Sequence, residues 1–310
     1  MNSHEPCQLY NITQFVREFA PKVVVDCTAG EGGHALTIAN ILGQRGKIVA
    51  IEIDPVYFQI LKENTQNVKN LIPVHSNYIN IQEIVATYAT GKVDAVLFDF
   101  GMSSFHLEQS GRGFSYRKSE LLDLRFNPDE GEPLYKKLWK MDQNQIEDVL
   151  RKYGESRFAK RLAHRIYINQ NRIRTTEDLN NVIRKSIPQN LFNEEIPKIY
   201  QAFRIFTNNE LENILSGLYG ALRCLNEGGI ILTIAYHSLE DRICKSLKSI
   251  NGIRVITKKP LVPSESEISE NPRCRSSKLR VFQKEEHDEE SIISWYRNSH
   301  SLCAPIMSRR

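Results

Sequence analysis

Long apolar runs and targeting signals are missing from this sequence. No stretch of about 18 consecutive apolar residues occurs, which argues against a membrane-spanning helix. The first residues have no apolar core of a secretory signal, and residues 1–10 contain no arginine of the kind found in mitochondrial transit peptides. We therefore expect a cytoplasmic protein that makes no membrane contact.

Metal-ligand spacing is also absent. None of the six cysteines stands in a Cys-x-x-Cys pair, and no histidines are clustered at zinc-finger spacing. The sequence therefore predicts reduced thiols, as in the cytosol, and no bound metal. It leaves open whether the chain forms a homodimer.

Strong overall charge is lacking too, since the formal net charge is only +4. The basic residues are nevertheless concentrated. Residues 135–174 contain eleven Lys or Arg against four Asp or Glu, and residues 254–280 contain seven against three. Such local basic surface suits the phosphate backbone of a nucleic acid, although a solvated helix face is an equal alternative from charge alone.

Apolar stretches of strand length alternate with helical stretches in the first hundred residues. The expected strands are 22–26, 47–53, 71–75 and 93–100, and the helices between them are 34–42, 56–63 and 81–88. This alternation predicts a parallel sheet that is covered by helices on both faces. The pattern returns with helices at 208–225 and 240–250 and strands at 230–235, 254–257 and 279–282.

Between these halves, residues 134–200 show only helical periodicity. Helices are expected at 145–153, 157–168 and 176–187, and the run Thr175-Thr-Glu-Asp178 is a plausible N-terminal cap for the last. We interpret the stretch as a helical insertion into the α/β domain. The expected division is 1–106 and 206–283 for the α/β domain, 107–205 for the inserted domain and 284–310 for a loose tail.

A glycine-rich turn follows the first expected strand, in the run Asp26-Cys-Thr-Ala-Gly-Glu-Gly-Gly-His34. Glycines such as Gly30, Gly32 and Gly33 let a ligand approach the backbone closely. Glu52 ends the second strand about twenty residues later, where a carboxylate can accept hydrogen bonds from both ribose hydroxyls. These features fit NAD, FAD or S-adenosylmethionine, and a purely structural turn remains an alternative.

Acidic residues around the turn favour S-adenosylmethionine among these cofactors. Asp26 and Glu31 would repel a pyrophosphate but not a sulfonium or an ammonium group. Asp99 ends the fourth strand, and ligands of open α/β sheets bind beyond the carboxyl ends of the strands. We expect Asp99 to face the amino-acid end of the cofactor or the reacting amine; alternatively, Asp99 anchors a loop and Asp26 caps its strand.

Eight motifs in a fixed order carry a resemblance to a known family. They occupy residues 28–34, 99–104, 111–117, 122–125, 153–159, 201–205, 236–242 and 271–280. The most specific are Tyr-His-Ser-Leu-Glu-Asp-Arg at 236–242 and Arg-Cys-Arg-Ser-Ser-Lys-Leu-Arg at 273–280. Over roughly residues 22–282, the chain closely resembles the bacterial ribosomal RNA small subunit methyltransferase H family, also called MraW.

The resemblance implies a fold, a reaction and a set of contacts. The fold is a class I S-adenosylmethionine-dependent methyltransferase, Rossmann-like with a mostly parallel seven-stranded sheet, with an inserted all-helical domain. The reaction is methylation of the exocyclic N4 of a decoding-centre cytidine in 16S ribosomal RNA, so the expected partner is small-subunit ribosomal RNA or the 30S particle. The implied cofactor contacts are Gly32, Gly33, His34, Glu52, Tyr78, Asp99 and His106.

Methyl transfer to N4 needs hydrogen-bond acceptors around the amine, because the lone pair is delocalised into the ring and the amine must lose a proton. The candidate catalytic residues are Asp99, Ser103 and Ser104. His237 either lies beside the target base or caps the fifth strand. Cys27 is expected to be a small packed residue, since N4 attacks the methyl group directly and needs no cysteine nucleophile.

Basic residues in two loops are the expected RNA contacts. The first group flanks aromatic residues, an arrangement typical of nucleotide stacking or, alternatively, of a packed lid over the cofactor. The second group lies in the motif at 271–280 and is expected to meet phosphates. The candidates are Arg112, Arg117 and Arg125 in the first group and Arg273, Arg275, Lys278 and Arg280 in the second.

Three other functions share some of these features. An amino methyltransferase acting on DNA or another RNA, or an organellar relative acting on mitochondrial small-subunit ribosomal RNA, would use the same chemistry. A small-molecule methyltransferase would need neither the basic helical insertion nor the arginine-rich loop. A non-catalytic binding protein would bind the cofactor without turnover.

Overall fold

The computed structural model describes residues 6–286 and 288–303 of the chain. Two compact units can be distinguished in it. The first contains residues up to Gly101 and residues 211–303, and the second contains residues 102–210. The chain therefore leaves the first unit once and returns to it once, as an inserted unit requires.

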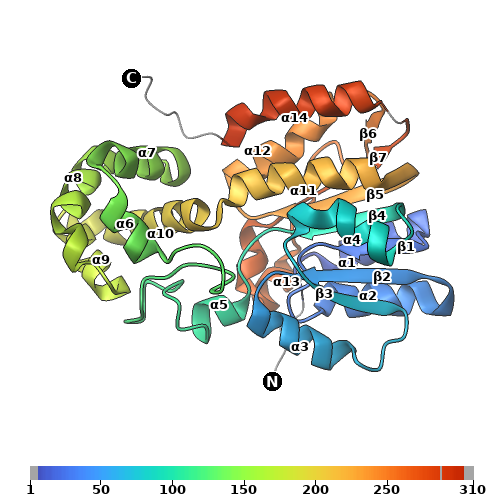
Figure 1. Cartoon of the computed structure of the whole chain (residues 1–310), viewed down its shortest axis with the longest axis horizontal. Coiled ribbons are helices and arrows are strands. Elements are labelled where there is room, and N and C mark those ends of the chain that lie inside the picture. The colour runs from blue at the N-terminus through green and yellow to red at the C-terminus, as the bar shows by residue number, and fades with distance from the viewer. Residues whose placement is uncertain (1–5, 287, 304–310) are drawn as a thin grey trace. The chain divides into compact units, whose positions relative to one another are not determined.

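A seven-stranded sheet forms the centre of the first unit (Figure 1). The strand order is β3-β2-β1-β4-β5-β7-β6, in which β7 runs antiparallel to both of its neighbours. The expected mostly parallel α/β sheet of seven strands is thus confirmed. The strands are β1 (Val23–Asp26), β2 (Lys47–Glu52), β3 (Leu71–His75), β4 (Val93–Asp99), β5 (Leu225–Ala235), β6 (Ile253–Val255) and β7 (Lys278–Lys284).

Helices α1 (Leu9–Phe19), α2 (Gly33–Leu42) and α3 (Pro55–Thr65) cover one face of this sheet. Ile12, Ile38 and Leu61 from these helices form one buried cluster with strand residues of a single face, such as Ile48 and Leu97. Each of these side chains is at most 1% exposed. Burial of this apolar surface fixes which strand residues face inward, and it therefore also fixes which residues emerge at the strand ends.

Helices α4 (Ile81–Tyr88) and α11 (Glu210–Cys224) of this unit lie next to each other (Figure 1). Glycines on α11 make this approach possible. A Cβ atom on Gly220 would lie 2.5 Å from Ile81, and one on Gly217 would lie 2.6 Å from the ring of Tyr78. Helix α12 (Ser238–Ser246) and the short helix α13 (Glu265–Glu270) complete the part of this unit that precedes β7.

The C-terminal segment is not a loose tail in the part that the structure describes. Helix α14 (Glu289–Cys303) follows β7, and Ile292 and Trp295 on it are buried. The indole of Trp295 donates a hydrogen bond to Ser246 at the end of α12. The expectation of a tail is therefore wrong for residues 289–303, because an amphipathic helix docks there behind an acidic linker.

The second unit is helical. Its helices are α5 (Ser104–Glu108), α6 (Leu134–Lys140), α7 (Gln143–Gly154), α8 (Ala159–Asn169), α9 (Thr176–Arg184) and α10 (Phe192–Asn208). The cap expected at Thr175 is confirmed, because its hydroxyl accepts from the backbone of Asp178 while the Asp178 carboxylate accepts from the backbone of Thr175. Helix α10 was not among the expected helices, since it lies between those expected at 176–187 and 208–225 and shares only residue 208 with the latter.

Two cysteines of the first unit are joined, in contrast to the expectation of reduced thiols. Cys7 and Cys274 form a disulfide across 267 residues of sequence. The other four cysteines, Cys27, Cys224, Cys244 and Cys303, are buried free thiols. Sequence spacing could not reveal this pair, since only the folded chain brings Cys7 beside the turn that precedes β7.

Candidate active site

Three carboxylates end three neighbouring parallel strands. Asp26 ends β1, Glu52 ends β2 and Asp99 ends β4. Because β1 pairs in parallel with both β2 and β4, all three side chains emerge at the same edge of the sheet. This is the edge at which the sequence predicted the cofactor.

The turn after β1 is hydrogen-bonded to both neighbouring strand ends. The Thr28 hydroxyl accepts from the backbone N–H of Asp99 at 2.7 Å, and the backbone N–H of Gly30 donates to Glu52 Oε2 at 2.8 Å. Gly32 then starts helix α2 with φ of 97°, a left-handed conformation that favours glycine. The turn is thereby fixed between Glu52 on one side and Asp99 on the other.

Glu52 is buried and accepts two backbone hydrogen bonds. Besides Gly30, the N–H of Asp54 donates to Glu52 Oε1 at 2.7 Å. Burial penalises the charged carboxylate more than these donors favour it, so the pKa of Glu52 is raised to about 7. Each carboxylate oxygen retains a second lone pair, which suits a ligand that brings hydroxyl donors.

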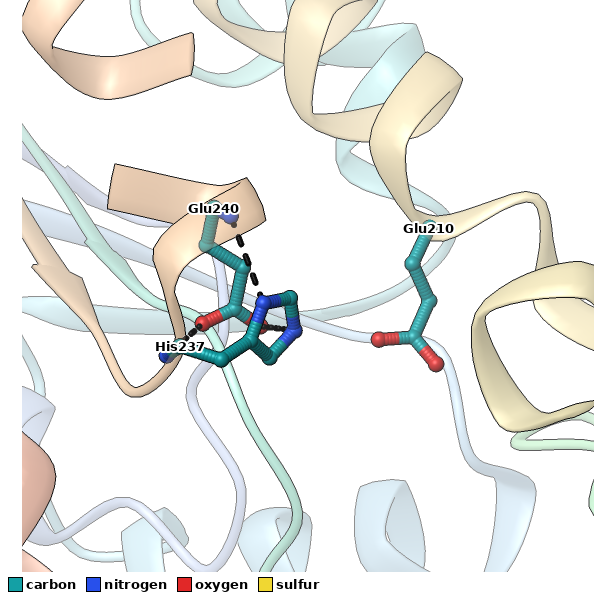
Figure 2. A group of neighbouring side chains, drawn as sticks. All are labelled: Glu210, His237 and Glu240. Carbon is teal, nitrogen blue, oxygen red and sulfur yellow. Dashed lines mark hydrogen bonds and ion pairs between the residues drawn. The ribbon is translucent and has the colours of Figure 1, made fainter. Parts of the chain in front are cut away.

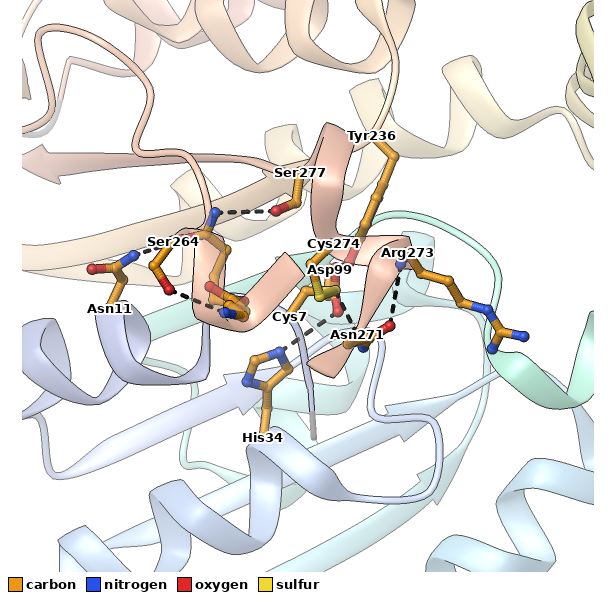
Figure 3. Close-up of a disulfide and its surroundings, with 12 residues drawn as sticks. Cys7, Asn11, His34, Asp99, Tyr236, Ser264, Asn271, Arg273, Cys274 and Ser277 are labelled. Atoms are coloured by element: carbon orange, nitrogen blue, oxygen red, sulfur yellow. Dashed lines mark hydrogen bonds and ion pairs between the residues drawn. A yellow bond between two sulfur atoms is a disulfide. The ribbon is translucent and has the colours of Figure 1, made fainter. Parts of the chain in front are cut away.

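Asp99 is flanked by two side chains, one at each oxygen (Figure 3). The Tyr236 hydroxyl donates to Asp99 Oδ1 at 2.9 Å. His34 Nε2 lies 3.6 Å from Asp99 Oδ2, which is an ion-pair distance too long for a hydrogen bond. Burial opposes a charge on His34, but Asp99 and Asp26 outweigh it and raise the pKa of His34. The carboxylate of Asp99 itself is 20% exposed, so it can reach a ligand.

Asp26 lies behind this group and is fully buried. Burial raises its pKa to about 6, although His34 and the N–H of Thr28 act in the opposite direction. Its Oδ2 atom and His34 Nδ1 have no hydrogen-bond partner among the described residues. Two buried polar atoms left unsatisfied beside a glycine turn fit a site that a polar, cationic ligand completes.

Tyr78 begins the short turn that follows β3, at the same edge of the sheet. Its ring makes edge contacts with Phe98 and Phe100, and Gly217 leaves room for it. An aromatic surface of this kind suits an adenine base. Cys27 is buried, and burial raises the pKa of its thiol well above the usual value, which keeps the thiol protonated and agrees with its interpretation as a packed residue.

His237 is the N-cap of helix α12 (Figure 2). Its Nδ1 atom accepts from the Glu240 backbone N–H at 3.4 Å, and its Nε2 atom lies 3.0 Å from Glu240 Oε1. Glu240 in turn accepts from the backbone N–H groups of Tyr236 and His237. His237 therefore caps the helix that follows β5, and not the strand itself; its expected place beside the target base stays a prediction.

Ser103, Ser104 and His106 belong to the second unit. Ser103 Oγ lies 2.8 Å from His106 Nδ1, and His106 is buried against both Phe114 and Phe126, whose rings stack on each other. These contacts give His106 a packing role within the helical unit. Ser104 begins helix α5, and its side chain is outside the part of the chain that the structure describes.

The proposed RNA contacts differ in availability. Arg280 is buried and makes two hydrogen bonds to Asp241, so its guanidinium is held inside the first unit, and the expectation of a phosphate contact is corrected for it. Arg112 and Arg125 donate to loop carbonyls, and Arg125 also pairs with Asp123. Three candidates retain exposed or half-exposed side chains without an ion pair among the described residues, namely Arg117, Arg275 and Lys278. Arg273 is half-buried.

Sequence reasoning missed Thr28 and Tyr236 as members of the site. Both stand inside motifs that the sequence had singled out, but neither carried a role there. A hydroxyl residue immediately after a strand end is a usable signal, because such a residue meets the adjacent strand ends of a parallel sheet. The contact between Tyr236 and Asp99 depends on the pairing of β4 with β5, which the sequence order alone does not give.

The sequence is similar to a known protein family and to several named proteins. A family model described as the MraW methylase family matches residues 1–285. The ribosomal RNA small subunit methyltransferase H of Clostridium botulinum (strain Kyoto / Type A2) is 36% identical over 285 residues, which cover 84% of this chain and 92% of that protein. Proteins of the same name from Leptospira interrogans (36% identity, 90% and 86% coverage) and Thermosipho africanus (35% identity, 84% and 91% coverage) are also similar. Within the described residues, every helix is too short or too polar to cross a membrane.

Proposed function

This chain belongs to the MraW methylase family, and from that premise we propose that it methylates the exocyclic N4 of a decoding-centre cytidine in small-subunit ribosomal RNA. The chain is an S-adenosylmethionine-dependent methyltransferase. The observation that carries the proposal is the turn fixed between Glu52 and Asp99, since it sets a ribose acceptor and an amine acceptor on either side of one glycine bend. Its relatives are named for the small-subunit RNA, and the proposed substrate places the reaction in the cytoplasm.

The chain's own residues divide the tasks of binding. Glu52 accepts from the ribose hydroxyls, Tyr78 lies against the adenine, and the backbone at Gly32 and Gly33 allows close approach. The buried acid Asp26 and the partly exposed Asp99 favour a ligand that carries positive charge. When bound, S-adenosylmethionine supplies an electrophilic methyl carbon.

Asp99 acts on the amine of the target base. Its carboxylate accepts a hydrogen bond from N4–H and thereby turns the nitrogen lone pair toward the methyl carbon. As the nitrogen lone pair forms the new bond to the methyl carbon and the C–S electron pair leaves with sulfur, the carboxylate stabilises the positive charge that develops on the nitrogen; the N4 proton then passes through Asp99 to water. The leaving group needs no metal ion, because the departing sulfur is neutral once the methyl group has left.

We assign RNA binding to basic side chains of both units. Arg275 and Lys278 in the first unit and Arg117 in the second are the side chains that remain available for phosphate. The second unit, in our proposal, serves substrate recognition.

A reconstitution experiment tests the function. The purified protein is incubated with labelled S-adenosylmethionine and with small subunits from a strain that lacks the N4 mark, and the RNA is digested and analysed by mass spectrometry. We expect N4-methylcytidine at one position. Label on carbon 5, on a ribose hydroxyl or on DNA alone would refute the assignment, and so would an absence of S-adenosylmethionine binding in calorimetry.

A further inference from the structure

Tyr236 follows strand β5 and contacts the carboxylate on which the proposed chemistry depends. Its hydroxyl donates to Asp99 Oδ1 at 2.9 Å, while His34 lies beside the other oxygen (Figure 3). Burial, reinforced by the charge of Asp99, raises the pKa of the tyrosine hydroxyl well above its usual value. The hydroxyl therefore stays protonated and remains a donor at any working pH.

Tyr236 is held in place through both its backbone and its ring. Its backbone N–H donates to Glu240 Oε2 at 2.7 Å, and Glu240 is only 1% exposed. On the other side the ring lies against Gly101, where a Cβ atom would stand 2.9 Å from the ring and φ is 152°. The motif from Tyr236 to Glu240 thus fixes a tyrosine hydroxyl next to Asp99, and glycine at position 101 leaves the space for it.

We propose that Tyr236 is a positioning residue that orients the Asp99 carboxylate toward the target amine. The inference rests on the proposed role of Asp99. With Oδ1 held by the tyrosine, the carboxylate cannot rotate freely, and its orientation at the moment of amine approach is fixed in advance. Tyr236 need not touch the base to affect the rate.

The variant Tyr236→Phe removes only the hydroxyl. We expect kcat to fall about 10- to 100-fold, which is what one hydrogen bond to a charged group contributes, while the Kd for S-adenosylmethionine changes little. Tyr296→Phe is the matched control, since that hydroxyl pairs with Ser216 instead; its kcat and its Kd for S-adenosylmethionine should equal those of the unaltered protein.

A double-mutant cycle with Asp99→Asn decides whether the tyrosine acts through Asp99. If it does, the double variant is no slower than Asp99→Asn alone. Additive losses in the cycle, an unchanged kcat in Tyr236→Phe, or an equal loss in its kcat and its affinity for S-adenosylmethionine would overturn the inference while leaving the methylation itself established. Failure of the unaltered protein to methylate N4 would instead refute the proposed function.

A separate observation concerns the segment before helix α1. Cys7 is joined to Cys274, and the next residue, Gln8, donates from its side chain to Ser277 at 3.1 Å and from its backbone to Glu267. The segment 6–8 is therefore fastened to the turn before β7 by one covalent bond and several hydrogen bonds. We refer to it as the N-terminal strap.

The strap lies directly on the glycine turn. A Cβ atom on Gly33 would stand 2.4 Å from Pro6 Cγ, so the proline covers the start of helix α2. Glu267, which accepts from the strap, is close enough for its charge to raise the pKa values of His34 and Tyr236. The strap and the Asp99 cluster therefore share one neighbourhood.

From this placement we infer that the disulfide is a redox control on retention of the methyl donor. A dithiol reductant transfers two electrons to the Cys7–Cys274 bond, which yields two thiols on the chain and a disulfide in the reductant. The freed strap then depends on hydrogen bonds alone. The inference rests on S-adenosylmethionine binding at the glycine turn, and it predicts faster dissociation from the reduced protein.

Stopped-flow dissociation of S-adenosylmethionine tests this control. Thiol titration of the denatured protein should give four thiols before reduction with dithiothreitol and six after it, because four of the six cysteines are free. We expect dissociation to become several-fold faster on reduction, and a Cys274→Ser variant to dissociate at the fast rate whether or not reductant is present. Equal rates in both redox states, or six thiols from the outset, would overturn the inference, whereas no binding in either state would refute the cofactor site itself.

Discussion

Glu52→Gln tests the cofactor site through its charge. The carboxylate accepts from the N–H groups of Gly30 and Asp54, and burial raises its pKa to about 7. Glutamine keeps the shape but has one oxygen, so its amide nitrogen must face one of these two donors. The variant therefore loses the ribose acceptor and one backbone hydrogen bond together.

The expected change in affinity for S-adenosylmethionine follows from the pKa of Glu52. If only the ionised carboxylate binds ribose, about one tenth of the protein is competent at pH 6 and about nine tenths at pH 8, so affinity for S-adenosylmethionine should rise about tenfold between these values. At pH 8 the variant should bind about 10- to 100-fold more weakly, since hydrogen bonds to charged groups contribute about 1.5–3 kcal/mol. The affinity of the variant should not show the tenfold rise between pH 6 and pH 8, because that rise comes from ionisation of Glu52.

Calorimetric titrations at pH 6, 7 and 8 provide the measurement, with thermal denaturation as the control for folding. The effect of pH on the free energy of unfolding has the opposite sign to its effect on affinity. Because the folded state holds the Glu52 proton up to about pH 7 and the unfolded state releases it near 4.5, this group lowers the free energy of unfolding as pH rises across that window. The reasoning is refuted if Glu52→Gln binds S-adenosylmethionine as tightly as the unaltered protein at pH 8, or if both proteins show the same pH dependence.

Three further predictions concern other parts of the chain. Asp99→Asn should lower kcat at least a hundredfold with little change in cofactor affinity, as measured by single-turnover methylation and calorimetry; an equal loss in both would make Asp99 a binding residue only. Burial lowers the pKa of Lys284 to about 8, so the unfolded state binds the extra proton between pH 8 and 10.5, and the free energy of unfolding should rise with pH there unless Lys284→Met removes the slope. Arg275→Ala should weaken RNA binding and reduce the salt dependence by about one ion, whereas Arg45→Ala, at the opposite edge of the sheet, should not; equal effects would contradict the assigned surface.

Much of the first unit could be predicted because its strands are locally encoded. Residues of β1 and β4 form short apolar runs that end in an acid, and the glycine turn marks the point where the chain reverses into α2. Parallel topology then requires the three acids to share an edge, which is why Asp26, Glu52 and Asp99 could be grouped before any coordinates were known.

The remaining features depend on contacts between distant segments. Arg275 and Arg280 belong to the same motif and look alike in sequence. Arg280, in strand β7, is nevertheless buried against Asp241 of helix α12, while Arg275 stays exposed in the preceding turn. Helix α14 was not expected, because the acidic residues before it resemble a disordered tail. Its docking depends on the hydrogen bond from Trp295 to Ser246, which is distant in sequence. Local sequence patterns do not predict which arginine or which helix makes a contact of this kind with a distant segment.

The charges at the sheet edge bear on which ligand the site favours. Burial raises the pKa values of both Asp26 and Glu52, so neutral pH lies close to the titration of two acids that flank one turn. A ligand with a sulfonium, an ammonium and two ribose hydroxyls stabilises the ionised form of such acids, whereas a pyrophosphate would destabilise it. The cost of burying these carboxylates is therefore recovered only with a cationic ligand, and this selects S-adenosylmethionine over dinucleotides at a glycine turn that either could otherwise enter.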